Sequence, residues 1–91
     1  MYLEIVTPEA TLFKGEVTSV SVPGVNGEFE MLNNHAPIVS LLKEGYVKIK
    51  GNITLEEEVE QAFKKTEKGV WLAINSGTIE MKENKVIVLA D

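Results

Sequence analysis

The chain has 91 residues, enough for one domain with its own hydrophobic core but too few for two. It contains no cysteine, which excludes disulfide bonds, thiolate catalysis and cysteine-ligated zinc. The net charge is −5 and the basic residues are scattered, so neither nucleic acid nor an anionic membrane surface is an expected partner. The apolar runs are too short to span a bilayer, and the first residues lack a basic leader, so we expect no membrane insertion and no signal peptide.

Apolar and polar residues alternate with a period of two along most of the chain, which is typical of strands with one buried face. In chain order, the clearest alternations lie at residues 3–6, 18–22, 47–50 and 79–82. Two further runs, residues 38–42 and 86–89, are more continuously apolar and predict central strands. Short connections rich in glycine, proline and asparagine separate these segments, so the sequence predicts a single all-β domain, a sandwich or a barrel.

One segment breaks the alternation and predicts a helix of two to three turns within residues 54–68. Thr54 and Glu57 have the spacing of a capping box, and Leu55, Val59 and Phe63 follow one another at intervals of four. Glutamates precede lysines, as the helix dipole favours, and a glycine follows at position 69. The alternative is a long polar hairpin loop.

No catalytic, cofactor or metal site is expected from the residue pattern. His35 is the only histidine, and a general base needs an orienting acid and a nucleophile that the sequence does not place beside it. The glycines near residue 24 lack the lysine and serine or threonine of a phosphate-binding loop. Trp71 lies in an apolar run and is expected in the core, with an interface anchor as the alternative.

Several segments, in a fixed order, resemble the β-sandwich domain of ATP synthase ε subunits. Residues 22–38, with the sequence VPGVNGEFEMLNNHAPI, are similar to the family signature that begins with a Pro-Gly pair and ends in His-Ala-Pro. Residues 3–9, 12–17 and 43–49 resemble further strands of the family, and residues 76–91 resemble its closing strands, with Thr78 in place of a glycine. The resemblance covers nearly the whole chain outside residues 52–69.

The resemblance implies a flattened β-sandwich of about ten strands in two sheets, without catalytic activity. It also implies a role in the central stalk, where the subunit links the γ subunit to the membrane c-ring and couples ion transport to ATP synthesis. By position, Gly27 and Glu28 are expected to face the polar loops of the c-ring. His35, Ala36 and Pro37 are expected to face the γ subunit. The expected location is the cytoplasmic face of the bacterial plasma membrane, as a peripheral protein.

Two features depart from the family pattern. Residues 52–69 are expected to be an insertion where a short hairpin is usual. The chain also ends at Asp91, whereas typical members continue into a C-terminal helical hairpin that carries ATP-binding residues, so we expect no ATP site and no ε-type inhibition of hydrolysis. Two other readings stay open: a free β-sandwich adaptor without a rotor role, and, more distantly, a small enzyme built on His35 with Glu28 or Glu30.

Overall fold

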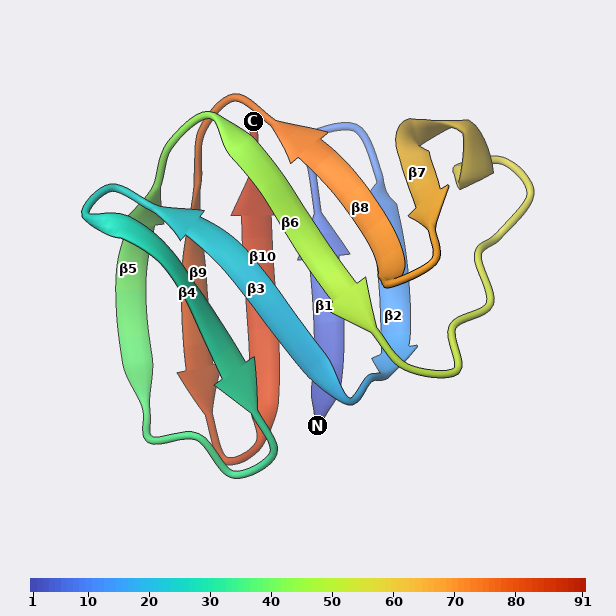
Figure 1. Cartoon of the computed structure of the whole chain (residues 1–91). Helices are drawn as coiled ribbons and strands as arrows, with labels where there is room; N and C mark the ends of the chain where they lie inside the picture. Colours follow the sequence, from blue (N-terminus) through green and yellow to red (C-terminus); the bar gives the residue numbers. More distant parts are fainter.

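The computed structural model describes all 91 residues, and nearly all of its regular structure is β (Figure 1). Ten strands follow one another along the chain, and the only helix is one short 3-10 turn before the seventh strand. In chain order, the elements are β1 (Tyr2–Val6), β2 (Thr11–Glu16), β3 (Ser19–Gly24), β4 (Gly27–Leu32), β5 (Ile38–Leu42), β6 (Gly45–Lys50), η1 (Glu60–Ala62), β7 (Phe63–Thr66), β8 (Gly69–Ile74), β9 (Gly77–Lys82) and β10 (Lys85–Ala90). The predicted all-β fold is therefore confirmed, including the number of strands.

The strands form one hydrogen-bonded sheet that curls into two facing layers (Figure 1). The back layer has the order β2-β1-β10-β9-β5, and the front layer has the order β4-β3-β6-β8-β7. The layers are continuous only at a seam where β3 meets β5, and there a single residue pair, Gly24 and Leu42, is in register. All strand pairs are antiparallel except β1 and β10, which run side by side in the same direction.

The period-two alternation decides which side chains lie between the layers. In the back layer, Leu3 of β1 lies opposite Val86 of β10, and both are fully buried. In the front layer, Val20 of β3 lies opposite Ile49 of β6, and both are again fully buried. Together with residues of the other strands, they form one core of 19 buried apolar residues. Because the chain has no disulfide, this core is the main source of stability.

The predicted helix within residues 54–68 is wrong. Only Glu60–Ala62 are helical, with 3-10 geometry, and Phe63–Thr66 form strand β7, which pairs with β8. The spacing of Leu55, Val59 and Phe63 does mark core contacts, because Phe63 is buried and the other two are partly buried against the core. Short helices are marginal on their own, and pairing Phe63 with Leu72 of β8 buries the same side chain in a strand.

Residues 51–59, which we call the strap, cross the open side of the curled sheet between its two end strands. Thr54 and Glu56 lie beside residues 11–14 of β2, while Ile53 and Leu55 lie beside the β7–β8 hairpin. Ile53, Leu55 and Val59 pack against the core from this side. The strap therefore shields core residues that neither layer covers.

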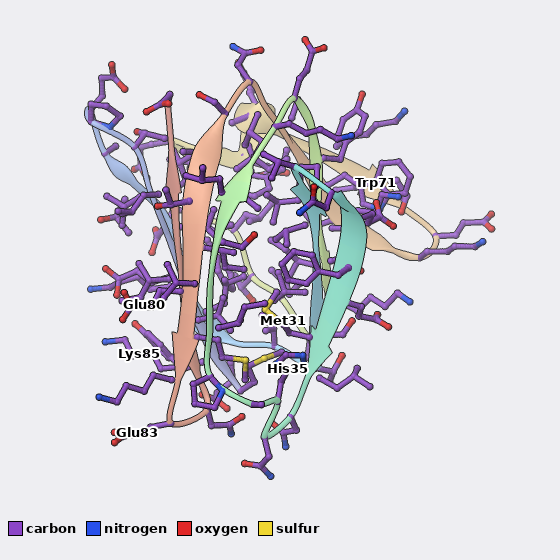
Figure 2. The ribbon with its side chains drawn as sticks, turned by 90° about the vertical axis from the view of Figure 1, so that its left-hand side faces the viewer. Met31, His35, Trp71, Glu80, Glu83 and Lys85 are labelled. Carbon is purple, nitrogen blue, oxygen red and sulfur yellow. The ribbon has the colours of Figure 1, made fainter.

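Two expectations about exposure also need correction. β5 is not a central strand: it pairs with β9 along its length but with β3 at one residue only, and its side chains at 39 and 41 point to solvent. Trp71 is not in the core either. It lies on the outer side of the front layer, while Met31 lies between the layers (Figure 2). By contrast, residues 86–89 fall in β10, which is central as predicted.

The left-handed glycines provide a matched test of this packing. Gly27 and Gly69 have similar φ angles, +127° and +141°, so alanine is strained at both. A Cβ at Gly27 would meet nothing within 4 Å, whereas one at Gly69 would collide with the backbone carbonyl of Ile49. We expect Gly27→Ala to cost ~1–2 kcal/mol of unfolding free energy and Gly69→Ala clearly more. Urea denaturation of the two variants checks this, and equal losses would contradict the placement of β8 against β6.

Candidate functional site

The β3–β4 hairpin is closed by two glycines because backbone and side chains approach closely there. Gly24 lies opposite Gly27, and the turn between them consists of Val25 and Asn26. A Cβ at Gly24 would come within 2.8 Å of both the Gly27 carbonyl oxygen and the Phe29 ring. The hairpin therefore depends on glycine at 24 for space and at 27 for its positive φ.

Glu28, which follows Gly27 in β4, forms an ion pair on the outer side of the front layer. Its carboxylate lies 3.0 Å from the Lys48 ammonium of β6, reaching across β3. The same ammonium lies 4.5 Å from the centre of the Trp71 ring, and Trp71 in turn packs against Tyr46 with 5.3 Å between ring centroids. Glu28 is still half exposed, so this pair contributes little to stability, and the carboxylate stays accessible.

Sequence reasoning missed Lys48 and Trp71 as neighbours of Glu28, and Tyr46 as the neighbour of Trp71. A signal was present, because Tyr46, Lys48 and Lys50 alternate with the apolar residues of their strand and so must point outward. The register that places β6 beside β3 and β8 cannot be read from local alternation. A second pair, Glu30 and Lys50 at 4.0 Å, repeats the arrangement one step along the same strands.

His35, Ala36 and Pro37 lie in the loop between β4 and β5. The backbone N–H of His35 donates to the Leu32 carbonyl, and its Nδ1 lies 2.7 Å from the Ala36 carbonyl. The loop is anchored by its neighbours: Asn33 Oδ1 accepts from the Met1 ammonium at 2.7 Å, and the N–H of Asn34 donates to Asn84 Oδ1 at 2.8 Å. These bonds hold the loop to the start of β1 and to the β9–β10 turn.

The arrangement gives no support to catalysis at His35. Its side chain has no hydrogen bond or ion pair with Glu28 or Glu30, the two acids that an enzyme hypothesis would use. No group of three histidine, aspartate or glutamate side chains is arranged to hold a metal ion. No helix in the structure has the length and apolarity needed to cross a membrane.

The two predicted contact regions lie at opposite ends of one strand. Gly27 and Glu28 begin β4, and Leu32 ends it just before the His35 loop. A strand of this length spans ~17 Å at the usual rise per residue. The structure therefore separates the two regions along one edge strand.

An exposed apolar surface runs along β5 from the His35 loop towards the hairpin. We call Val25, Val39, Leu41 and Leu89 the apolar strip; their exposed fractions are 49%, 76%, 63% and 51%. Leu41 and Leu89 both lie opposite Thr78 of β9, one on either side, and the N–H of Val25 donates to the Leu41 carbonyl. Pro37 directly precedes β5, so the loop and the strip are continuous. Exposed apolar side chains gathered in this way are typical of contact surfaces.

Two examples show that this fold occurs in solved ATP synthase structures. One is a cryo-EM structure of the central stalk and c-ring of the Tetrahymena thermophila mitochondrial ATP synthase, with a TM-score of 0.73 and 13% identity, covering 99% of this chain and 62% of that one. The other is a cryo-EM structure of the Euglena gracilis mitochondrial ATP synthase, with a TM-score of 0.74 and 15% identity over 97% of this chain and 48% of that one.

Closer relatives are known by sequence. An ATP synthase epsilon chain of Campylobacter concisus is 41% identical over 91 residues, all of this chain and 60% of that protein. One of Chlorobium limicola is 37% identical over 89 residues, 98% of this chain and 86% of that protein.

The family model described as the β-sandwich domain of the ATP synthase delta/epsilon chain matches residues 1–91 without leaving out the strap. Because the model covers the whole chain and a 37% identical epsilon chain is matched over most of its length, the chain belongs to the ATP synthase delta/epsilon-chain β-sandwich family, as an epsilon-type N-terminal domain.

Proposed function

We propose that this domain is a non-catalytic central-stalk subunit of a rotary ATP synthase, peripheral to the membrane on its cytoplasmic side. In this role it links the γ subunit to the c-ring and so couples ion transport to ATP synthesis. The observation that supports the proposal best is the separation of two regions along β4: Glu28 lies at the hairpin end of this strand, and the His35 loop follows its other end. The apolar strip runs from the His35 loop along β5 towards the hairpin. Family membership supports the rotor assignment.

The γ-facing side consists of His35, Ala36 and Pro37 together with the apolar strip. A lasting contact within a rotor needs buried apolar area, and the side chains of Val39 and Leu41 are the most exposed large apolar groups in the chain. The His35 loop is held by the hydrogen bonds of Asn33 and Asn34, so a partner would meet a surface that is already ordered.

The ring-facing side is the hairpin that carries Gly27 and Glu28. The turn residues Val25 and Asn26 are exposed, and the Glu28 carboxylate beside them is half exposed, which suits a contact with the polar loops of a ring. The Glu28 carboxylate is already held by Lys48, so a basic or amide group on the partner would share a fixed carboxylate and would not have to order a mobile one. A close-packed sandwich between the two contacts transmits torque with little internal slack.

Charge placed in the apolar strip tests the γ contact. Val39→Glu and Leu41→Glu should each weaken the association of this chain with the γ subunit about tenfold or more, because a carboxylate would have to be desolvated at the interface. Ala73→Glu, an exposed position on the outer side of the front layer, is the matched control and should bind as the unaltered chain does. Surface plasmon resonance with purified γ subunit measures all three. If Val39→Glu and Leu41→Glu bind like the control, γ does not dock on the strip.

Charge reversal in the hairpin tests the ring contact in the assembled complex. Glu28→Lys should reduce ATP-driven ion pumping in inverted membrane vesicles while leaving ATP hydrolysis in place, since the altered group would face the ring and not the catalytic head. Glu30→Lys is the matched control, because Glu30 has the same kind of pair with Lys50 farther along the strand. Stability should change by under ~0.5 kcal/mol in each. Equal pumping by the two variants would exclude Glu28 as the ring contact, and failure of the chain to co-purify with any synthase subunit would favour a free adaptor.

A further inference from the structure

Residues of the strap and of the β7–β8 hairpin line a cleft. Both segments lie on the side of the molecule away from β5 (Figure 1). The volume of the cleft is about 540 Å³ and it is open to solvent. Ile53 and Leu55 of the strap and Val70 of β8 form an apolar floor, and all three are only partly buried. None of the residues proposed to contact the γ subunit or the c-ring lines this cleft, although Lys50 and Lys68 also line the hollow beside Glu28.

One wall of the cleft is an unpaired strand edge. β7 pairs with β8 on one side only, and it ends the path of the sheet. Thr66 and Gly69 flank the turn of the β7–β8 hairpin and form a hydrogen-bonded pair. Hydrogen-bonded and non-hydrogen-bonded pairs alternate along an antiparallel ladder, so the N–H and C=O of the next residue, Lys65, point away from β8. None of the backbone hydrogen bonds outside helices and strands involves β7. Lys65 therefore offers a donor and an acceptor that a further strand could use.

The charges around the cleft are mostly positive, although the chain is acidic overall. Lys50, Lys65 and Lys68 line it against a single carboxylate, Glu67. Lys68 has no ion pair, Lys50 has only a long one of 4.0 Å, and Lys65 is held at 2.7 Å by Glu60. A carboxylate of a partner could therefore pair with Lys68 directly, and it would share Lys50 with Glu30 and Lys65 with Glu60. A second copy of this chain is a poor occupant, because pairing two β7 edges would bring lysines together.

We propose that this cleft binds an extended, acidic segment of a partner protein, which adds to β7 as a further strand. The backbone of the segment would pair with Lys65, its apolar residues would contact Ile53, Leu55 and Val70, and its carboxylates would meet Lys50 and Lys68. Acidic and apolar residues would alternate along the bound segment, because successive side chains of a strand point to opposite faces of the sheet. The proposal does not depend on the rotor role of the domain.

A synthetic peptide tests the proposal directly. The probe is a blocked seven-residue peptide in which glutamate and valine alternate, titrated into the ¹⁵N-labelled 91-residue chain and followed by NMR. We expect saturable shifts at the cleft residues and at least about tenfold slower exchange of the Lys65 amide, because that amide becomes hydrogen-bonded. A peptide with lysine in place of glutamate should bind at least about tenfold more weakly.

Two controls separate strand addition from simple charge attraction. N-methylation of the peptide amides on the edge that pairs with β7 should abolish binding, whereas N-methylation on the other edge should not. Lys68→Glu should weaken binding about fivefold or more, and Lys82→Glu, which makes the same charge change in the back layer, should not. No protection of the Lys65 amide, equal binding of the two N-methylated peptides, or equal effects of the two lysine substitutions would overturn the proposal. Binding to phosphatidylserine vesicles in preference to the peptide would overturn it as well.

Discussion

Two backbone hydrogen bonds join the layers of this domain, and the rest of the architecture depends on how the sheet turns at that seam. The N–H of Lys43 donates to the Pro23 carbonyl at 2.9 Å, and the N–H of Val25 donates to the Leu41 carbonyl at 3.2 Å. Beyond this point, β5 belongs to the back layer and β3 to the front layer. The core holds the two layers together elsewhere, since no disulfide does so. Curling one sheet in this way buries one face of every layer and leaves the other face free for recognition.

The division between buried and free faces explains why recognition and stability are separable in this domain. The side chains of β5 at 39 and 41 project outward, whereas Leu42, at the seam, is buried. Outward residues of the front layer, such as Trp71 and Lys48, contact one another, and Trp71 is not among the partly buried apolar residues that pack against the core. Substitutions on either outer face therefore change what the domain can bind at little cost to folding.

Local alternation predicted the strands well because one buried face imposes a period of two on each of them. It located the buried residues of β1 and β9, and the glycines at 24 and 27 marked the hairpin. It failed where tertiary pairing decides the outcome. The interval of four between Leu55, Val59 and Phe63 fits a helix, yet β8 offers Phe63 a strand partner.

Exposure was also beyond the reach of local pattern. Trp71 is apolar and lies in an apolar run, so composition places it inside, but its register opposite Lys48 puts it outside. The run at 38–42 looks central for the same reason, and only the position of β5 at the turn of the sheet exposes it. For the proposed contacts, Gly27, Glu28 and the His35 loop came from the resemblance alone. The ion pair with Lys48 and the apolar strip required three-dimensional register.

The parallel pair of β1 and β10 has a consequence for the order in which this domain folds. Tyr2 is in register with Lys85, so the first strand of the chain finds its place only when the last one is present. Bringing β1 and β10 together closes a loop of nearly the whole chain, and this loss of entropy precedes the contacts between the two strands that offset it. Sheets dominated by such distant pairings fold in roughly milliseconds to seconds, far more slowly than helical bundles of the same size. During synthesis, the edge of β1 that pairs with β10 therefore stays unpaired until β10 has been made. Unpaired strand edges of this kind favour aggregation and the binding of chaperones.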